Sequence, residues 1–198
     1  MKQYFEENDS LPRDEVKIFL EKFGHSFTFF SKRGLFSFNE VDSVSLALVE
    51  NIPKIHGKLL DLGCGYGAVG IILAKINEIT LYGCDINKYA VEMAKKNALF
   101  NRVEATYFFS DSFKNVEGTF DTIVLNPPIH AGKDVVYSMF RDAKNHLASS
   151  GKFYVVIQKK HGAATAINEL SKTYEKLKTV YKKKGIYVLE CLRGEQVQ

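Results

Sequence analysis

The stretch that most constrains this chain is a glycine-rich segment between an apolar run and a helical pattern. An apolar run containing Asp61 leads into Gly63-Cys64-Gly65-Tyr66-Gly67, and apolar residues at helical spacing begin at Ala68. This pattern predicts a strand, a tight turn and a helix. The Gly-x-Gly-x-x-Gly spacing that ends at Gly70 also fits turns whose glycines let a dinucleotide approach the backbone at a helix N-terminus. The spacing by itself leaves the ligand open.

From Lys58 onward, predicted strands alternate with predicted helices. Apolar and β-branched runs predict strands over Lys58–Leu62, Ile79–Asp85, Glu104–Ser110, Thr119–Asn126, Gly151–Gln158, Glu175–Tyr181 and Gly185–Leu192. Helical spacing predicts helices over Ala68–Ile76, Asn87–Asn101, Lys133–Ala148 and Ala163–Lys172. The alternation predicts an α/β fold, a Rossmann-like seven-stranded and mostly parallel sheet with helices on both faces. Because the last two strands are joined by too few residues for a parallel crossover, one of them must run antiparallel.

The first 40 residues do not share this alternation. Val16–Lys22 and Ser26–Ser31 are short β-type runs on either side of Gly24-His25, which predicts an N-terminal β-hairpin. We therefore expect a hairpin or lid extension over residues 1–40 and one compact domain over residues 41–198.

An aromatic-rich segment links the hairpin to the next helix. Its Phe36 and Phe38 would either wall a pocket, as part of a lid, or cover the sheet. Asp42 or Ser43 then caps a helix that is ended by Pro53.

Composition excludes several classes of protein. The 198-residue chain is 45% hydrophobic and 25% charged, which is typical of a globular domain. No apolar run approaches the ~20 residues that span a bilayer, and the N-terminus lacks the apolar core of a signal peptide. A cytoplasmic location and no membrane partner are expected. Cys64, Cys84 and Cys191 are too scattered for disulfides or a zinc site, so we expect no metal and packing roles for Cys64 and Cys84.

Charge is unevenly distributed along the chain. Residues 1–150 hold 17 Lys and Arg against 19 Asp and Glu, a net charge of −2. Residues 151–198 hold 10 against 4, a net charge of +6. A basic final quarter either faces a polyanion or is ordinary solvated surface.

Polar side chains end the predicted strands. Asp61, Asp85, Asp111, Asn126 and Gln158 close or follow successive strands. Ligands of doubly wound sheets bind outside the carboxyl ends of the strands. These five side chains are therefore the first candidates for a ligand site.

The Asp61 carboxylate argues against a dinucleotide. It would lie beside the turn that holds a pyrophosphate, and two like charges in a partly desolvated cleft repel each other by roughly several kcal/mol. A cationic ligand such as S-adenosylmethionine, which carries a sulfonium and an ammonium, fits better. Asp85, 24 residues further on, suits the hydroxyls of an adenosine ribose. Alternatively, Asp61 caps N–H groups of its own turn and Asp85 caps the next helix, for which Asn87 is better placed.

The fourth predicted strand leads into Asn126-Pro127-Pro128. Two prolines remove two N–H donors and hold the backbone extended. The side-chain carbonyl of Asn126 and the backbone carbonyl of Pro127 could then grip both hydrogens of a planar amino group and aim its nitrogen lone pair. Alternatively, the segment is a turn that stops the strand.

Taken together, these motifs resemble a known family. The Asp-x-Gly-x-Gly turn, the strand ends at Asp85 and Asp111, and Asn126-Pro127-Pro128 occur in the order and spacing of class I S-adenosylmethionine-dependent methyltransferases. More closely, the chain resembles the methyltransferase small domain family, whose best-known members are RsmC-type ribosomal RNA guanine-N2 methyltransferases. Further matching segments are Gly34–Ser37, Val41-Asp42, Asn126–Ile129, Ala131–Lys133 and Val156–Ala163.

The resemblance implies a reaction, methyl transfer from S-adenosylmethionine to the exocyclic amino group of a guanine in 16S ribosomal RNA. Ribosomal RNA or the 30S particle would be the partner, and a monomer or homodimer the assembly. Asn126 and Pro127 would be the catalytic residues. Cofactor contacts are implied for Asp61, Gly63, Cys64, Gly65, Gly67, Asp85, Ile86, Asp111, Ser112 and Asn126. Substrate contacts are implied for Phe36, Pro128, Ile129, His130, Lys133 and Lys159.

One position departs from the family's pattern, and other functions stay open. Larger guanine-N2 enzymes carry two copies of the domain and often an aromatic residue after the two prolines, whereas this chain has one copy and Ile129. Base stacking, typically worth ~1–3 kcal/mol, would then fall to His130 or Phe36. The alternatives are methylation of a protein glutamine or of adenine, and an inactive RNA-binding or ribosome-assembly module. The lysines that would contact phosphate, or else be solvated, are Lys133, Lys159, Lys160 and Lys182-Lys183-Lys184.

Overall fold

Seven strands form the central sheet of the structure, a computed structural model that describes residues 15–35, 37 and 39–194. They are β3 (Gly57–Leu62), β4 (Ile79–Asp85), β5 (Ala105–Phe109), β6 (Phe120–Leu125), β7 (Leu147–Gln158), β8 (Lys176–Lys183) and β9 (Ile186–Leu192). Their order across the sheet is β5-β4-β3-β6-β7-β9-β8. Neighbouring strands are parallel except that β9 runs antiparallel to β7 and β8. The prediction of a mostly parallel sheet with one antiparallel strand in its last hairpin is confirmed.

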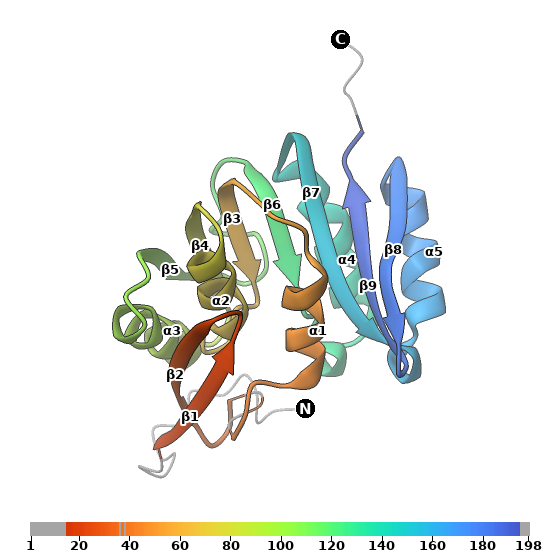
Figure 1. The fold of residues 1–198 in the computed structure, drawn as a ribbon. Helices are drawn as coiled ribbons and strands as arrows, with labels where there is room; N and C mark the ends of the chain where they lie inside the picture. Colours follow the sequence, from red (N-terminus) through yellow and green to blue (C-terminus); the bar gives the residue numbers. More distant parts are fainter. Residues whose placement is uncertain (1–14, 36, 38, 195–198) are drawn as a thin grey trace.

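Five α-helices in the described part of the chain cover both faces of the sheet (Figure 1). They are α1 (Ser43–Asn51), α2 (Ala68–Ile76), α3 (Lys88–Phe100), α4 (Lys133–Asn145) and α5 (Ala163–Thr173). Helices α1, α2 and α3 share one hydrophobic core, whereas α4 and α5 share the other. Successive strand residues point to opposite faces, so Leu59 joins the first core and Leu60 the second. Because β6 is buried on both faces, its Ile123, Val124 and Leu125 are all apolar.

The predicted N-terminal hairpin is present as β1 (Glu15–Lys22) and β2 (His25–Lys32). Two buried amides, one in α3 (Asn97) and one at the residue that caps its end (Asn101), bond to the hairpin. The Asn97 side chain accepts from the Phe30 N–H at 2.7 Å and donates to the Phe30 carbonyl at 2.9 Å. Asn101 makes the same pair of bonds with Thr28, at 3.0 and 2.8 Å. Phe27 and Phe29 are buried in the first core, so the hairpin covers the helical layer.

One predicted boundary is wrong. The helix expected over Lys133–Ala148 ends at Asn145, and β7 begins at Leu147 instead of Gly151. The cause is pairing across the sheet, because Leu147 lies opposite Phe120 of β6 and the Phe120 N–H donates to the His146 carbonyl at 2.8 Å. The helical spacing of apolar residues continues beyond Asn145, but pairing with β6 draws the following residues into β7 and ends the helix.

All three cysteines are buried and unpaired. Burial raises the pKa of Cys84 to about 12, so this thiol stays protonated and packs, as expected. Within the described ranges, no group of three or more His, Cys, Asp or Glu side chains is arranged to hold a metal ion. None of the helices described is long and apolar enough to cross a membrane.

Candidate active site

The polar strand ends meet at one edge of the sheet because the parallel strands end in register. Leu62 of β3 lies opposite Cys84 of β4 on one side and Leu125 of β6 on the other. The Cys64 N–H donates to the Cys84 carbonyl at 2.9 Å, and the Ser110 N–H donates to the Asp85 carbonyl at 3.0 Å. These bonds tie the segments that follow β3 and β5 to the end of β4.

The glycine turn after β3 needs glycine for two different reasons. Gly63, Gly65 and Gly67 all have left-handed backbones, with φ of 68°, 55° and 89°. A Cβ atom added at Gly63 or Gly65 would meet nothing within 4 Å, so the backbone there faces open space. A Cβ atom at Gly67 would lie 3.1 Å from the Ala94 Cβ, so this glycine serves packing against α3. Gly63 and Gly65 are the positions where a ligand can approach the backbone.

Asp61 is buried under this turn, with 4% of its surface exposed. Its Oδ2 accepts from the Gly70 N–H at 2.9 Å, which caps the first turn of α2. Burial raises the pKa of Asp61 to about 7, opposed by the Gly70 hydrogen bond and reinforced by the charge of Asp85. Asp61 therefore does cap backbone, but at the start of α2 and not at an N–H of its own turn. Among the described residues, Gly70 is the only donor to this carboxylate, which leaves Oδ1 for a ligand.

Asp85, the last residue of β4, binds the backbone of the glycine turn. Its Oδ2 accepts from the Gly65 N–H at 2.9 Å and its Oδ1 from the Asn87 N–H at 2.8 Å. Burial raises the pKa of Asp85 against these N–H groups. The cap of α3 is Asn87, whose side chain accepts from the Tyr89 and Ala90 N–H groups, so the helix-capping alternative for Asp85 is wrong.

The loop after β5 carries Asp111 and Ser112. Asp111 is half exposed and forms an ion pair with Lys114. Ser112 has a left-handed backbone, φ 53°, and its buried hydroxyl has no hydrogen-bond partner among the residues described. The buried Tyr107 hydroxyl likewise has none, and it lies 3.0 Å from where a Gly67 Cβ would be. Buried hydroxyl groups are normally hydrogen-bonded, so Ser112 and Tyr107 each keep hydrogen-bonding capacity that a ligand could use. The Ser31 hydroxyl of β2 is also buried without a described partner.

Asn126 follows β6 and contacts a residue that the sequence did not single out. Its Nδ2 donates to the Ser45 hydroxyl at 3.0 Å. Ser45 is buried in α1, and its own N–H donates to the Asp42 carboxylate at 3.1 Å. Because the amide nitrogen is engaged by Ser45, the Asn126 carbonyl oxygen points away from α1. The only sequence signal for Ser45 was its place three residues after the helix cap.

The two prolines leave one carbonyl unused. The Pro128 carbonyl accepts from the Ala131 N–H at 2.9 Å within the 3-10 helix η1 (Ile129–Ala131). No described N–H donates to the Pro127 carbonyl. Within the part of the chain that the structure describes, the Pro127 oxygen and the Asn126 side-chain oxygen therefore have no donor, which leaves them available for the predicted grip on an amino group.

Three of the remaining substrate candidates line two separate hollows, whereas Pro128 and His130 line neither. Ile129 and Lys133 line a small cavity of about 30 Å³ with Tyr137 and His161. Lys159 lines a separate and larger groove. Burial lowers the pKa of His161, as do the nearby charges of Lys160 and His130. Phe36 lies outside the described residues, as does Phe38.

Known proteins resemble the chain over most of its length. Residues 26–190 match the model of the methyltransferase small domain. The uncharacterized protein YbxB of Bacillus subtilis is 38% identical over 95% of this chain and 96% of its own length. Ribosomal RNA small subunit methyltransferase C of Haemophilus influenzae is 36% identical over 73% of this chain but only 47% of its own length.

A solved structure also superposes on most of the chain. The 16S rRNA N2 methyltransferase RsmC of T. thermophilus, in complex with AdoMet and guanosine, superposes with a TM-score of 0.82 and 27% identity. The match covers 91% of this chain and 51% of RsmC, so the chain spans about half the length of these RsmC proteins. The family model and these relatives together show that the chain belongs to the methyltransferase small domain family, a family of S-adenosylmethionine-dependent methyltransferases.

Proposed function

We propose that this protein transfers a methyl group from S-adenosylmethionine to the exocyclic N2 amino group of a guanine in 16S ribosomal RNA. The observation that carries the proposal is the pairing of β3 with β6, in which Leu62 lies opposite Leu125. Gly63 directly follows β3 and Asn126 directly follows β6. Neighbouring strands lie ~4.8 Å apart. The open glycine turn and the free amide oxygen are therefore adjacent.

The residues around the turn fit S-adenosylmethionine, which supplies a methyl group on a positively charged sulfur. Asp61 offers a buried carboxylate oxygen to the cationic methionine end. Gly63 and Gly65 offer open backbone beside it. Asp85 would accept from the ribose hydroxyls, since a carboxylate has about four lone-pair sites and the Gly65 and Asn87 N–H groups use two of them. The unpartnered Ser112 hydroxyl, with Cys64, Ile86 and Asp111, would complete the adenosine side, whereas Gly67 would act only through packing of the turn.

The acceptor side binds an amino group. The Asn126 and Pro127 oxygens accept its two hydrogens, which turns the nitrogen lone pair toward the methyl carbon. The nitrogen then forms a bond to that carbon as the carbon–sulfur bond breaks, and the nitrogen afterwards loses a proton to water. Most of the rate enhancement would come from this positioning, because the sulfonium is already a good leaving group.

The choice of guanine in 16S ribosomal RNA is supported by the relatives. RsmC of T. thermophilus, the neighbour at a TM-score of 0.82, was solved with guanosine, and the H. influenzae relative is named as a small-subunit ribosomal RNA methyltransferase. Ile129 and Lys133, beside Pro128 and His130, would contact the base and its sugar-phosphate.

The test is methyl transfer to 16S ribosomal RNA from cells that lack this protein. The purified protein and labelled S-adenosylmethionine are incubated with the RNA or with 30S particles, and the digested nucleosides are analysed by mass spectrometry. N2-methylguanosine is expected. Label in adenine or in a protein glutamine would overturn the assignment of guanine as the substrate. Absence of label from every acceptor would overturn the proposed methyltransferase function.

A further inference from the structure

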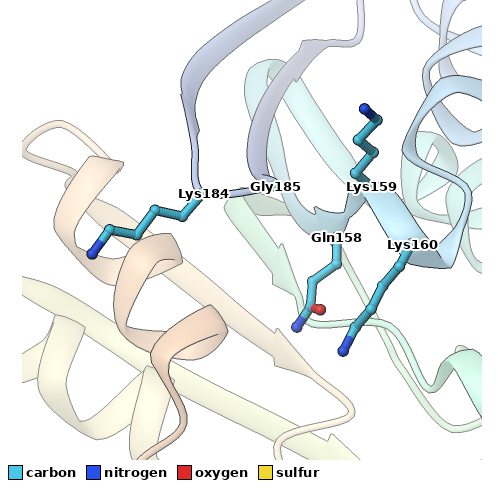
Figure 2. A pocket seen from close by; sticks show the side chains of 5 residues that line it. All are labelled: Gln158, Lys159, Lys160, Lys184 and Gly185. Atoms are coloured by element: carbon cyan, nitrogen blue, oxygen red, sulfur yellow. The ribbon is translucent and has the colours of Figure 1, made fainter.

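A groove lined by lysines lies at the same edge of the sheet as Asn126. Its volume is about 540 Å³, and the residues that line it, here called the lysine groove, are Gln158, Lys159, Lys160, Lys184 and Gly185 (Figure 2). Gln158 ends β7, the two following lysines belong to the 3-10 helix η2 (Lys159–His161), and the last two form the β8–β9 turn.

Backbone contacts hold the two sides of the groove together. The Lys159 N–H donates to the Gly185 carbonyl at 2.7 Å, and Gln158 lies opposite Ile186 in the β7–β9 pair. Lys184 and Gly185 both have left-handed backbones, with φ of 49° and 75°, which tightens the turn. The lysine side chains therefore project from a fixed frame.

The charges of the lysine groove are not neutralised. Lys159, Lys160 and Lys184 are exposed, and none forms an ion pair with an acidic residue that the structure describes. Some lysines elsewhere on the surface are paired, for example Lys95 with Glu92 at 2.8 Å and Lys172 with Glu169 at 2.7 Å. An unpaired cluster of cations attracts a polyanion.

The directions of the side chains favour an extended polyanion over a single small anion. Figure 2 shows Lys159, Lys160 and Lys184 pointing in three different directions from the groove. One phosphate could not be contacted by all three ammonium groups, whereas successive phosphates along a strand could. Gln158 lies between them and offers both a donor and an acceptor.

The lysine groove and the candidate acceptor site are adjacent. Strands β6 and β7 pair with Leu125 opposite Val155, so Asn126 and Gln158 lie at the same edge on neighbouring strands. Helix α1, which holds Ser45 against Asn126, also packs on β7, β8 and β9. The opposite half of this edge, formed by β3 and β4, is acidic through Asp61 and Asp85. The edge is thus divided into an acidic half for a cationic cofactor and a basic half.

We infer that the lysine groove binds the phosphate backbone of the single-stranded RNA that flanks the acceptor nucleotide. The inference rests on the proposed RNA substrate. Phosphate contacts position a strand without reading its sequence, and sequence-specific RNA recognition mostly takes unpaired bases. The groove would supply affinity, and the acceptor site would choose the base. The structure also selects among the lysines, since Lys182 lies over the Tyr187 ring at 5.2 Å and does not line the groove.

The test compares two triple variants. The groove variant carries Lys159→Gln, Lys160→Gln and Lys184→Gln. The control variant carries Lys54→Gln, Lys58→Gln and Lys176→Gln, three exposed lysines at the opposite edge of the sheet. Both are measured as full-length protein, by fluorescence anisotropy with a labelled single-stranded oligoribonucleotide at several salt concentrations. Calorimetry with S-adenosylmethionine shows that both are folded.

The expected result is a loss confined to the groove variant. Each phosphate contact on a single strand contributes about 0.7 to the slope of log K against log salt, so loss of three contacts lowers the slope by about 2 and the affinity roughly tenfold to a hundredfold at low salt. The control variant should bind RNA, and both variants should bind S-adenosylmethionine, as the unmodified protein does.

The outcomes separate this inference from the proposed function. If the unmodified protein methylates RNA while the groove variant binds it as tightly as the control does, the groove assignment is wrong and the proposed function stands. If the groove variant loses RNA binding but no protein transfers methyl groups to RNA, the groove assignment stands and the proposed function fails. If the unmodified protein does not bind the oligoribonucleotide, both are overturned.

Discussion

The side-chain nitrogen of Asn126 donates a hydrogen bond to the Ser45 hydroxyl over 3.0 Å, across 81 residues of chain. Ser45 is held in turn by the first turn of α1, where Asp42 accepts from the Val44 and Ser45 N–H groups. This contact holds the amide nitrogen of Asn126 toward α1, so the amide oxygen is the end left for other partners. A helix that precedes the sheet in sequence therefore orients the candidate catalytic residue.

Replacing Ser45 with alanine should lower kcat and leave binding almost unchanged. Without the hydroxyl, the Asn126 amide loses its orienting partner, and a hydrogen bond worth ~1 kcal/mol corresponds to roughly a fivefold change in rate. Steady-state kinetics with RNA would show the fall in kcat, with KM and the dissociation constant for S-adenosylmethionine retained.

Two further variants separate orientation from packing at this position. Ser45→Thr keeps the hydroxyl and should restore most of kcat, and Ser43→Ala removes an exposed hydroxyl from the same turn and should have no effect. A fall in kcat that threonine does not restore would contradict the orienting role.

Replacing Asn126 with alanine should abolish most methyl transfer. The variant loses the oxygen that grips the acceptor amino group, and loss of one pre-organised hydrogen-bonding group typically costs about 10²–10³ in kcat. Calorimetry should show that S-adenosylmethionine binding persists, because Asp61, Asp85 and the glycine turn are untouched. Turnover near that of the unmodified protein would exclude Asn126 from the reaction.

The affinity for S-adenosylmethionine should rise with pH through about 7. Burial raises the pKa of Asp61 to about 7, so the carboxyl is largely neutral at pH 6 and charged at pH 8. Only the charged form attracts the cationic methionine end. Calorimetry across this range should show the rise, and Asp61→Asn, which can still accept from Gly70, should bind weakly and without this pH dependence.

Asp61 should also make the protein without cofactor less stable as pH rises from about 4 to 7. Its pKa is raised above the unfolded value of 3.8, so in this window the folded state holds a proton that the unfolded chain has released. Stability then falls as pH increases. Thermal unfolding should give Asp61→Asn the higher midpoint at pH 8, and an unchanged difference from pH 4 to pH 8 would contradict the raised pKa.

Replacing Asn97 with alanine should destabilise the protein through the N-terminal hairpin. The fully buried amide bonds to Phe30 and also donates to the Tyr66 carbonyl of the glycine turn at 2.8 Å. Leaving these buried groups unpaired costs ~1–3 kcal/mol each, and 1 kcal/mol shifts the melting temperature by roughly 2–4 °C in a chain of this size. Asn115→Ala, at an exposed amide, is the control. Equal melting temperatures for the Asn97→Ala and Asn115→Ala variants would contradict a stabilising role of the Asn97 hydrogen bonds, here called the Asn97 clamp.

Patterns between neighbouring residues determined much of the fold. Glycine spacing, the alternation of strands and helices, and the short last connection were enough to predict the sheet, its antiparallel strand and the hairpin. Since parallel strands end at a common edge, the sequence also predicted that Asp61, Asp85 and Asn126 would meet. The helix Lys133–Ala148 was predicted too long because its end depends on the pairing of Leu147 with Phe120, which no local pattern contains.

By itself, then, the sequence of this protein determined the architecture and the glycine turn that follows the Asp61 strand, because strands, turns and caps depend on residues close together in the chain. Only the tertiary structure decided which distant residues surround that turn and how they orient and charge its side chains. The Ser45–Asn126 bond, the Asn97 clamp and the raised pKa of Asp61 each depend on burial and on partners distant in sequence. The lysine groove likewise needs η2 and the β8–β9 turn side by side. Such contacts arise from packing, which a local pattern does not specify.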